Sequence, residues 1–125
     1  MYMTFFTLLC ATVGGALGTF FRALAIKYFK FSSLFSILPL PTLIVNVIGS
    51  FLAGIFFYKL SSKNELYAFL SIGFCGGMTT MSTCVLESFL LIEKGSTTFG
   101  IINAVVNLVA SIVAVALGFK LSKGI

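Results

Sequence analysis

Four long apolar segments take up most of this 125-residue chain, at about 4–26, 40–58, 66–91 and 98–119. Each is close to the roughly 20 residues that an α-helix needs to cross the hydrocarbon core of a bilayer. The mean hydropathy of +1.16, with 59% hydrophobic and 9% charged residues, lies outside the range of water-soluble domains. The pattern predicts an all-α membrane protein whose four transmembrane helices form one domain over residues 1–125.

The eight Lys and Arg residues lie near the ends of these segments, which indicates contacts with lipid headgroups rather than a nucleic-acid surface. If the helices cross in series, the cations divide four and four between the two sides: Lys59, Lys63, Lys120 and Lys123 against Arg22, Lys27, Lys30 and Lys94. Such a balance gives the chain no preferred orientation, so we expect insertion both ways. Two copies in opposite orientations can then pair antiparallel.

Small and polar residues in the first two segments are candidate functional positions. Gly14 and Gly18 form a GxxxG pattern, which is typical of close helix packing. Arg22 follows one turn later, and it either reaches the lipid headgroups or lies in a vestibule that attracts anions. In the second segment, Asn46 either holds helices together or points its amide donors into a pathway.

A polar stripe runs along the fourth segment. Asn103, Asn107 and Ser111 follow one another at intervals of four residues, so they share one helix face. Polar side chains in lipid are costly and usually face the interior of a bundle or water. The stripe therefore favours a pathway for water or ions over a role in packing alone.

The third segment contains "GFCGGMTTMSTC" at 73–84. Adjacent Gly76 and Gly77 weaken a helix by about 1 kcal/mol each, and the hydroxyl side chains after them compete for backbone hydrogen bonds. We therefore expect a helix break built by the glycines, which a membrane tolerates only where protein buries it or where it lines a cavity. Glu87 is the only acid deep in a segment, and its carboxyl group needs a partner such as Ser, Thr or Lys.

This set of side chains favours anion binding. Hydroxyls and amides with almost no acids supply more donors than acceptors, and a small, hard anion such as fluoride needs closely spaced donors to replace its water. An enzyme is not expected, because the chain has no His and the lone buried acid has no second carboxylate. A small multidrug-type exporter needs a carboxylate in its first segment, and residues 1–26 contain none.

Three stretches resemble, in order and spacing, the signature sequences of the CrcB/Fluc fluoride channels: "GGALGTFFR" at 14–22, "TLIVNVIGSFLAG" at 42–54, and "GFCGGMTTMSTC" at 73–84 with "ES" at 87–88. The resemblance extends over the whole chain. It implies a multi-pass protein of the inner (plasma) membrane, an antiparallel dual-topology dimer with two pores, and passive export of toxic fluoride from the cytoplasm. It also implies a structural sodium ion (Na⁺) at the dimer centre, held by the backbone carbonyls of Gly76 and Thr79 from both subunits.

The resemblance further implies a set of pore and vestibule residues, which in this chain are Arg22, Asn46, Ser82, Thr83 and Glu87. The chain departs from the family pattern at three pore positions. Met81 and Cys84 stand where phenylalanines are usual, and Asn103 stands where a tyrosine is common.

Two hypotheses follow from these departures. In the first, a homodimer conducts fluoride through a re-lined track, with weakly polarised hydrogens from Met81 and hydrogen-bond donors from Cys84 and Asn103. In the second, the chain is one subunit of a heterodimer whose partner keeps the aromatic lining. The balanced cation count favours the homodimer, since a dedicated heterodimer subunit would have a one-sided bias.

Overall fold

The computed structural model describes residues 4–29, 38–60 and 64–124, and every regular element within them is helical. Four helical runs are long and apolar enough to cross a membrane: α1 (Phe5–Phe29), α2 (Leu40–Lys59), a third run from Glu65 to Glu93, and α6 (Thr97–Gly124). These confirm the four predicted segments, although α6 continues beyond the predicted end at residue 119. Pro41 lies in the first turn of α2, where its missing N–H has no helical partner to lose.

The third run is divided into α3 (Glu65–Tyr67), the π-helix η1 (Ala68–Cys75), α4 (Gly76–Met78) and α5 (Met81–Glu93). The predicted break is confirmed, but the glycines do not form it. Gly76 is helical, with φ −63° and ψ −38°, whereas Thr79 and Thr80 are extended. The break falls at the threonines because the Thr80 side chain accepts the N–H of Thr83 and so starts α5 as its N-cap.

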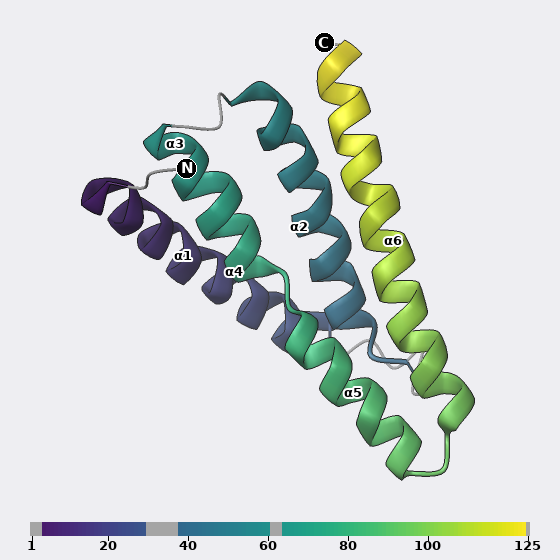
Figure 1. Cartoon of the computed structure of the whole chain (residues 1–125). Coiled ribbons are helices and arrows are strands. Elements are labelled where there is room, and N and C mark those ends of the chain that lie inside the picture. The colour runs from purple at the N-terminus through teal and green to yellow at the C-terminus, as the bar shows by residue number, and fades with distance from the viewer. Residues whose placement is uncertain (1–3, 30–37, 61–63, 125) are drawn as a thin grey trace.

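The runs pack as a bundle in which α2 lies along α6, η1 lies along α1, and α5 lies against α6 (Figure 1). The start of α1 and the ends of α2 and α6 lie toward one end of this bundle, and the turn from α5 to α6 lies at the other. This alternation agrees with serial crossing, so Lys59 and Lys120 lie at the end opposite Lys94. Lys30 and Lys63, which the cation count also uses, are outside the described residues.

Close backbone contact joins α1 to the third run. A Cβ atom on Gly14 would overlap the carbonyl oxygen of Phe69, and one on Gly77 would overlap the carbonyl oxygen of Gly15. Only glycine allows backbones to approach this closely, which confirms a packing role for the GxxxG pattern. The prediction that Gly76 and Gly77 build the break is therefore wrong. Both are helical, and Gly77 serves as a contact residue against α1.

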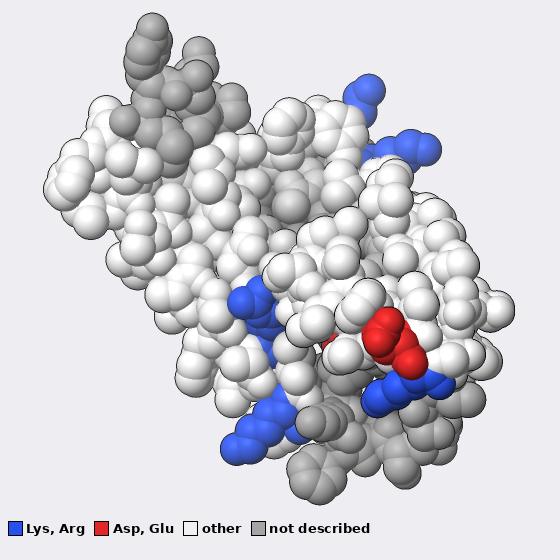
Figure 2. Space-filling model, turned by 60° about the horizontal axis from the view of Figure 1, so that its bottom comes forward, with Lys and Arg blue, Asp and Glu red and all other residues white. Residues whose placement is uncertain are grey.

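The exposed surface and the interior have the polarity expected of a protein in lipid. Large apolar side chains are exposed on all the long helices, including Phe5 (77%), Phe57 (58%) and Ile112 (60%). Figure 2 shows the end with the α5–α6 turn, where most of the visible surface is uncharged. Among the described residues, buried side chains include Thr42, Asn46 and other hydroxyl and amide groups. Many of the polar groups are therefore inside the bundle, as the cost of exposing them to hydrocarbon favours.

Candidate functional site

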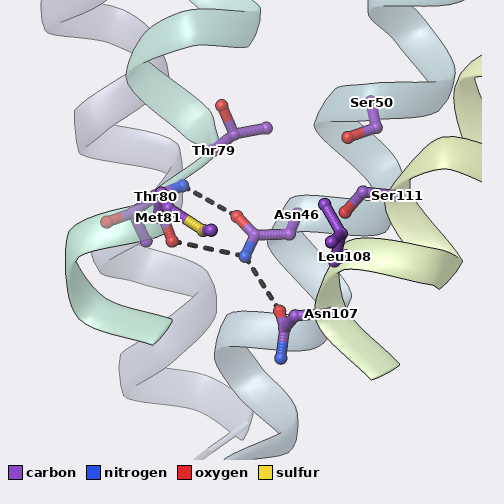
Figure 3. Close-up of a pocket in the computed structure, with 8 residues that line it drawn as sticks. All are labelled: Asn46, Ser50, Thr79, Thr80, Met81, Asn107, Leu108 and Ser111. Carbon is purple, nitrogen blue, oxygen red and sulfur yellow. Dashed lines mark hydrogen bonds between the residues drawn. The ribbon is translucent and has the colours of Figure 1, made fainter. Parts of the chain in front are cut away.

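Asn46, on the facing helix α2, forms hydrogen bonds to the backbone at the break in the third run. The backbone N–H of Thr80 donates to Asn46 Oδ1 at 2.7 Å, and Asn46 Nδ2 donates to the Thr80 carbonyl oxygen at 3.3 Å (Figure 3). The Thr80 N–H, which the break leaves without a helical partner, is thus satisfied by a buried amide, and the Thr80 carbonyl, which as the N-cap carbonyl also accepts at the start of α5, gains a second donor. Asn46 therefore joins α2 to the break, which is one of the two roles considered for it, and it also lines the pocket described below.

A chain of hydrogen bonds continues from Asn46 through α6 to α5. Asn46 Nδ2 donates to Asn107 Oδ1 at 2.9 Å, Asn107 Nδ2 donates to Asn103 Oδ1 at 3.2 Å, and Asn103 Nδ2 donates to Ser88 Oγ at 2.9 Å. The Ser88 hydroxyl ends the chain by donating to the Cys84 carbonyl at 2.8 Å. We refer to Asn46, Asn107, Asn103 and Ser88 as the amide relay.

The amide relay gives Asn103 and Asn107, two members of the polar stripe on α6, a structural role that the sequence did not predict. Asn103 and Asn107 are each 3% exposed, and their Nδ2 groups donate to oxygens of the protein. A buried amide must satisfy its donors locally, because leaving one unpaired costs about 1–3 kcal/mol. Asn103 therefore joins α6 to α5 through its donor, and Asn107 joins α6 to α2 by accepting from Asn46. Asn107 and Ser111 of the stripe also line a pocket.

A pocket of about 180 Å³ lies between α2, the break and α6. Its lining residues are Asn46, Ser50, Thr79, Thr80, Met81, Asn107, Leu108 and Ser111. Ser50 and Ser111 make no hydrogen bond to the other residues that line it, so their hydroxyls can donate to a guest (Figure 3). None of these lining residues is an acid, and the volume admits several groups of water size.

A hydroxyl cluster surrounds the start of α5. Thr80 Oγ1 lies 3.2 Å from Ser82 Oγ and donates to Thr83 Oγ1 at 3.0 Å. Ser82 and Thr83 are thus brought together with Thr80, but neither lines the pocket of the protomer. The sequence did not single out Thr80 or Ser50 as site residues, and it included Ser111 only as a member of the polar stripe. Their signal was the position of each serine four residues after an asparagine of the pocket, on the same helix face.

The two sulfur side chains have different environments. Met81 is 63% exposed and lines the pocket, whereas Cys84 is 1% exposed and lies outside it. In the protomer, the thiol is therefore not in a position to line this pocket. Cys84 remains a pore candidate only through the resemblance.

These environments predict different effects on stability when Met81 and Cys84 are each replaced by phenylalanine. Met81→Phe places a ring at an exposed position, so we expect unchanged stability. Cys84→Phe forces a ring into filled space and should destabilise the protein by about 1–3 kcal/mol. Thermal unfolding of the purified variants in detergent measures the difference. Equal stability of both variants would show that Cys84 has free volume beside it.

Glu87 has the partner that its depth in the membrane required. Thr42 Oγ1, on α2, donates to Glu87 Oε1 at 2.7 Å, and Thr42 is itself 1% exposed. The prediction of a hydroxyl partner is confirmed. Glu87 Oε2 is buried and has no hydrogen-bond partner in the described part of the chain.

Arg22 contacts the break directly. Its Nη1 donates to the carbonyl oxygen of Thr79 at 3.1 Å, and Thr19, one turn earlier on α1, donates from Oγ1 to the Gly77 carbonyl at 3.4 Å. The sequence left two roles open for Arg22, at the lipid headgroups or in a vestibule. The structure adds a third, in which a cation satisfies a carbonyl that the break leaves open.

The carbonyls of Gly76 and Thr79 fit the chemistry of the implied sodium site. In a continuous helix they would accept from Thr80 and Thr83, but Thr80 N–H donates to Asn46 Oδ1 and Thr83 N–H donates to Thr80 Oγ1. Gly76 also faces open space, because no atom lies within 4 Å of a Cβ built on it. Backbone oxygens without a helical donor are suitable ligands for a hard cation, and the Thr79 oxygen accepts only a side-chain donor, Arg22. The described residues contain no cluster of His, Cys, Asp or Glu that offers another metal site.

The fold and the pocket together define a multi-pass membrane protein in which a broken third helix borders a donor-lined pocket. The family model described as "CrcB-like protein, Camphor Resistance (CrcB)" matches residues 9–119. The chain belongs to this family.

Curated relatives cover nearly the full length of the chain. A protein from Pyrococcus abyssi is 38% identical over 122 residues, which are 94% of this chain and 96% of that protein. One from Shewanella baltica (strain OS185) is 39% identical over 118 residues (91% and 94%), and one from Campylobacter lari is 35% identical over 120 residues (94% and 98%). Each is named "Fluoride-specific ion channel FluC".

Proposed function

We propose that this chain is a fluoride-specific channel that lets the anion leave the cytoplasm passively across the inner membrane, and so relieves its toxicity. Relatives that match nearly the whole chain carry the name of such a channel. The structural observation that carries the proposal is the pocket at the break, which offers the hydroxyls of Ser50 and Ser111 beside an apolar thioether and no lining acid. Donors without neighbouring carboxylates favour an anion over a cation.

Within this proposal, the lining groups divide into donors and supports. The Ser50 and Ser111 hydroxyls replace part of the anion's hydration shell, and Met81 gives the pocket an apolar wall. Asn46 and Asn107 keep the pocket in shape through the amide relay. The hydroxyls of Ser82 and Thr83 and the carboxyl group of Glu87 belong to the next part of the pathway along α5.

The second part of the proposal is an antiparallel homodimer with two pores. The balanced cation count supports insertion in both orientations. Gly76 supports a contact between copies, because it is exposed beside the break and has no neighbour for its missing side chain, unlike Gly77. A small residue at a helix surface in lipid permits close approach of another helix.

The third part is a sodium ion at the dimer centre, held by the carbonyls of Gly76 and Thr79 from each subunit. When bound, the ion would supply positive charge to these carbonyl oxygens. The residues of this chain do the positioning: Asn46 and Thr80 take up the amide N–H groups that would otherwise occupy these carbonyls.

Efflux from liposomes tests the proposal. The purified chain, alone in liposomes loaded with fluoride or chloride, should release fluoride and retain chloride, as followed with ion electrodes. A hydrogen bond from a hydroxyl to a charged partner contributes about 1.5–3 kcal/mol. The double variant Ser50→Ala with Ser111→Ala loses two such bonds to the anion, so its rate of fluoride release should fall at least about tenfold. Its thermal stability should match the wild type.

Other outcomes would reject separate parts of the proposal. Similar release of both halides would contradict fluoride selectivity. Release only after co-expression with a second homologue would replace the homodimer by a heterodimer. An unchanged rate in the double serine variant would remove the pocket from the pathway.

A further inference from the structure

The contact between Arg22 and the Thr79 carbonyl links α1 to the centre of the proposed assembly. The guanidinium approaches an oxygen that the break has freed, since Thr83 N–H donates to Thr80 Oγ1 instead. Thr79 is also one of the two residues whose carbonyls form the proposed sodium site. One oxygen is therefore shared by a fixed side-chain cation and a site for a mobile one.

We infer that Arg22 competes with sodium for the Thr79 carbonyl and thereby sets the sodium concentration at which the central site fills. The inference rests on the sodium site of the proposed function. Two cations bound to one carbonyl oxygen lie only a few ångström apart. Even at an effective dielectric constant of about 20, their repulsion at this range changes a binding constant by about tenfold or more.

The position of the guanidinium is fixed by the backbone around it. Gly14 and Gly77 bring α1 against the third run, with no space for even a Cβ atom at either position. Thr19, on the same face of α1 as Arg22, adds a second contact through the Gly77 carbonyl. Because α1 cannot shift freely, Arg22 can yield to sodium only by changing its side-chain rotamer.

The charge of Arg22 is not cancelled nearby. No carboxylate pairs with it among residues 4–29, 38–60 and 64–124, and the one acid within the bundle, Glu87, accepts its hydrogen bond from Thr42. Arg22 is partly buried, and an unpaired cation repels a second cation a few ångström away. Arg22 therefore lowers the affinity of the adjacent carbonyls for sodium, and its removal should raise that affinity.

A sodium titration of stability tests the inference without measuring transport. The full-length protein in detergent is unfolded thermally at increasing sodium concentrations, with choline keeping the ionic strength constant. Arg22→Gln and Arg22→Met should each lower the sodium concentration for half-maximal stabilisation about tenfold. Arg22→Lys keeps the charge and should stay close to the wild type. Lys27→Gln is the matched control, because it removes an exposed cation from the last turn of the same helix, and its midpoint should not move.

The opposite results would overturn the inference. An unchanged midpoint in both neutral variants would show that Arg22 and sodium act independently, and a higher midpoint would show that Arg22 supports the site instead. The same shift in Lys27→Gln would attribute the effect to general surface charge. A further outcome is that sodium changes the stability of neither the wild type nor any Arg22 variant, while the wild type still releases fluoride. That outcome would reject the inference and leave the proposed channel function standing.

Discussion

Asn46→Leu should unfold the region around the break and abolish fluoride efflux. The substitution keeps the side-chain size but leaves two buried polar groups without a partner, Thr80 N–H and Asn107 Oδ1, and it removes one of the donors to the Thr80 carbonyl. Each unpaired group costs about 1–3 kcal/mol, so we expect a loss of about 2 kcal/mol or more in the free energy of unfolding. Thermal unfolding in detergent measures the loss, and liposome efflux should fall to the level of protein-free vesicles.

Asn64→Ala is the control for this substitution. Asn64 is an exposed N-cap whose Oδ1 accepts from Tyr67 N–H at 2.8 Å at the start of α3. Its loss should cost only about 1 kcal/mol and leave efflux intact. If Asn46→Leu is no more harmful than Asn64→Ala, then Asn46 does not hold the break.

Gly77→Ala should destabilise the protomer while Gly76→Ala should not, although the two glycines are adjacent and both helical. A methyl group on Gly77 meets the backbone of Gly15, which cannot move aside as a flexible side chain would. Overpacking of this kind costs about 1–3 kcal/mol or more. A methyl group on Gly76 meets nothing within 4 Å, so the better helix propensity of alanine should dominate there. Thermal unfolding of the two variants gives the comparison.

A larger substitution at Gly76 distinguishes folding of the protomer from formation of the dimer. Gly76→Leu should yield a folded protomer that no longer forms dimers, because the larger side chain occupies the face proposed for the second copy. Chemical crosslinking in liposomes measures the dimer fraction, and efflux should be lost with it. A Gly76→Leu protein that remains dimeric and conducts fluoride would place the contact between copies elsewhere.

The sequence was sufficient for the spans and the class of protein. Apolar runs of spanning length, with cations at their ends, leave few alternatives in lipid, because each backbone group must be paired within a helix. The motifs also located the break to within a few residues. They assigned it to the glycines, since propensity alone cannot show that a threonine will cap the next helix and that a glycine is needed for contact.

The roles of individual polar side chains depended on their neighbours in space. Four residues between two asparagines predict a common helix face, but they do not say whether the donors meet water, an anion or another amide. Only the arrangement of α2, α5 and α6 shows that Asn46, Asn107 and Asn103 satisfy one another and leave Ser50 and Ser111 facing the pocket.

The sequence by itself determined that this chain spans a membrane four times, that its third helix is interrupted and that its interior is rich in donors. Local patterns determine these properties, because lipid penalises every exposed polar group in the same way. The tertiary structure decided which donors are already used, and it placed Arg22 on the Thr79 carbonyl. Hydrogen-bond partners far apart in the chain depend on how helices meet, and the spacing of residues within one helix does not contain that information.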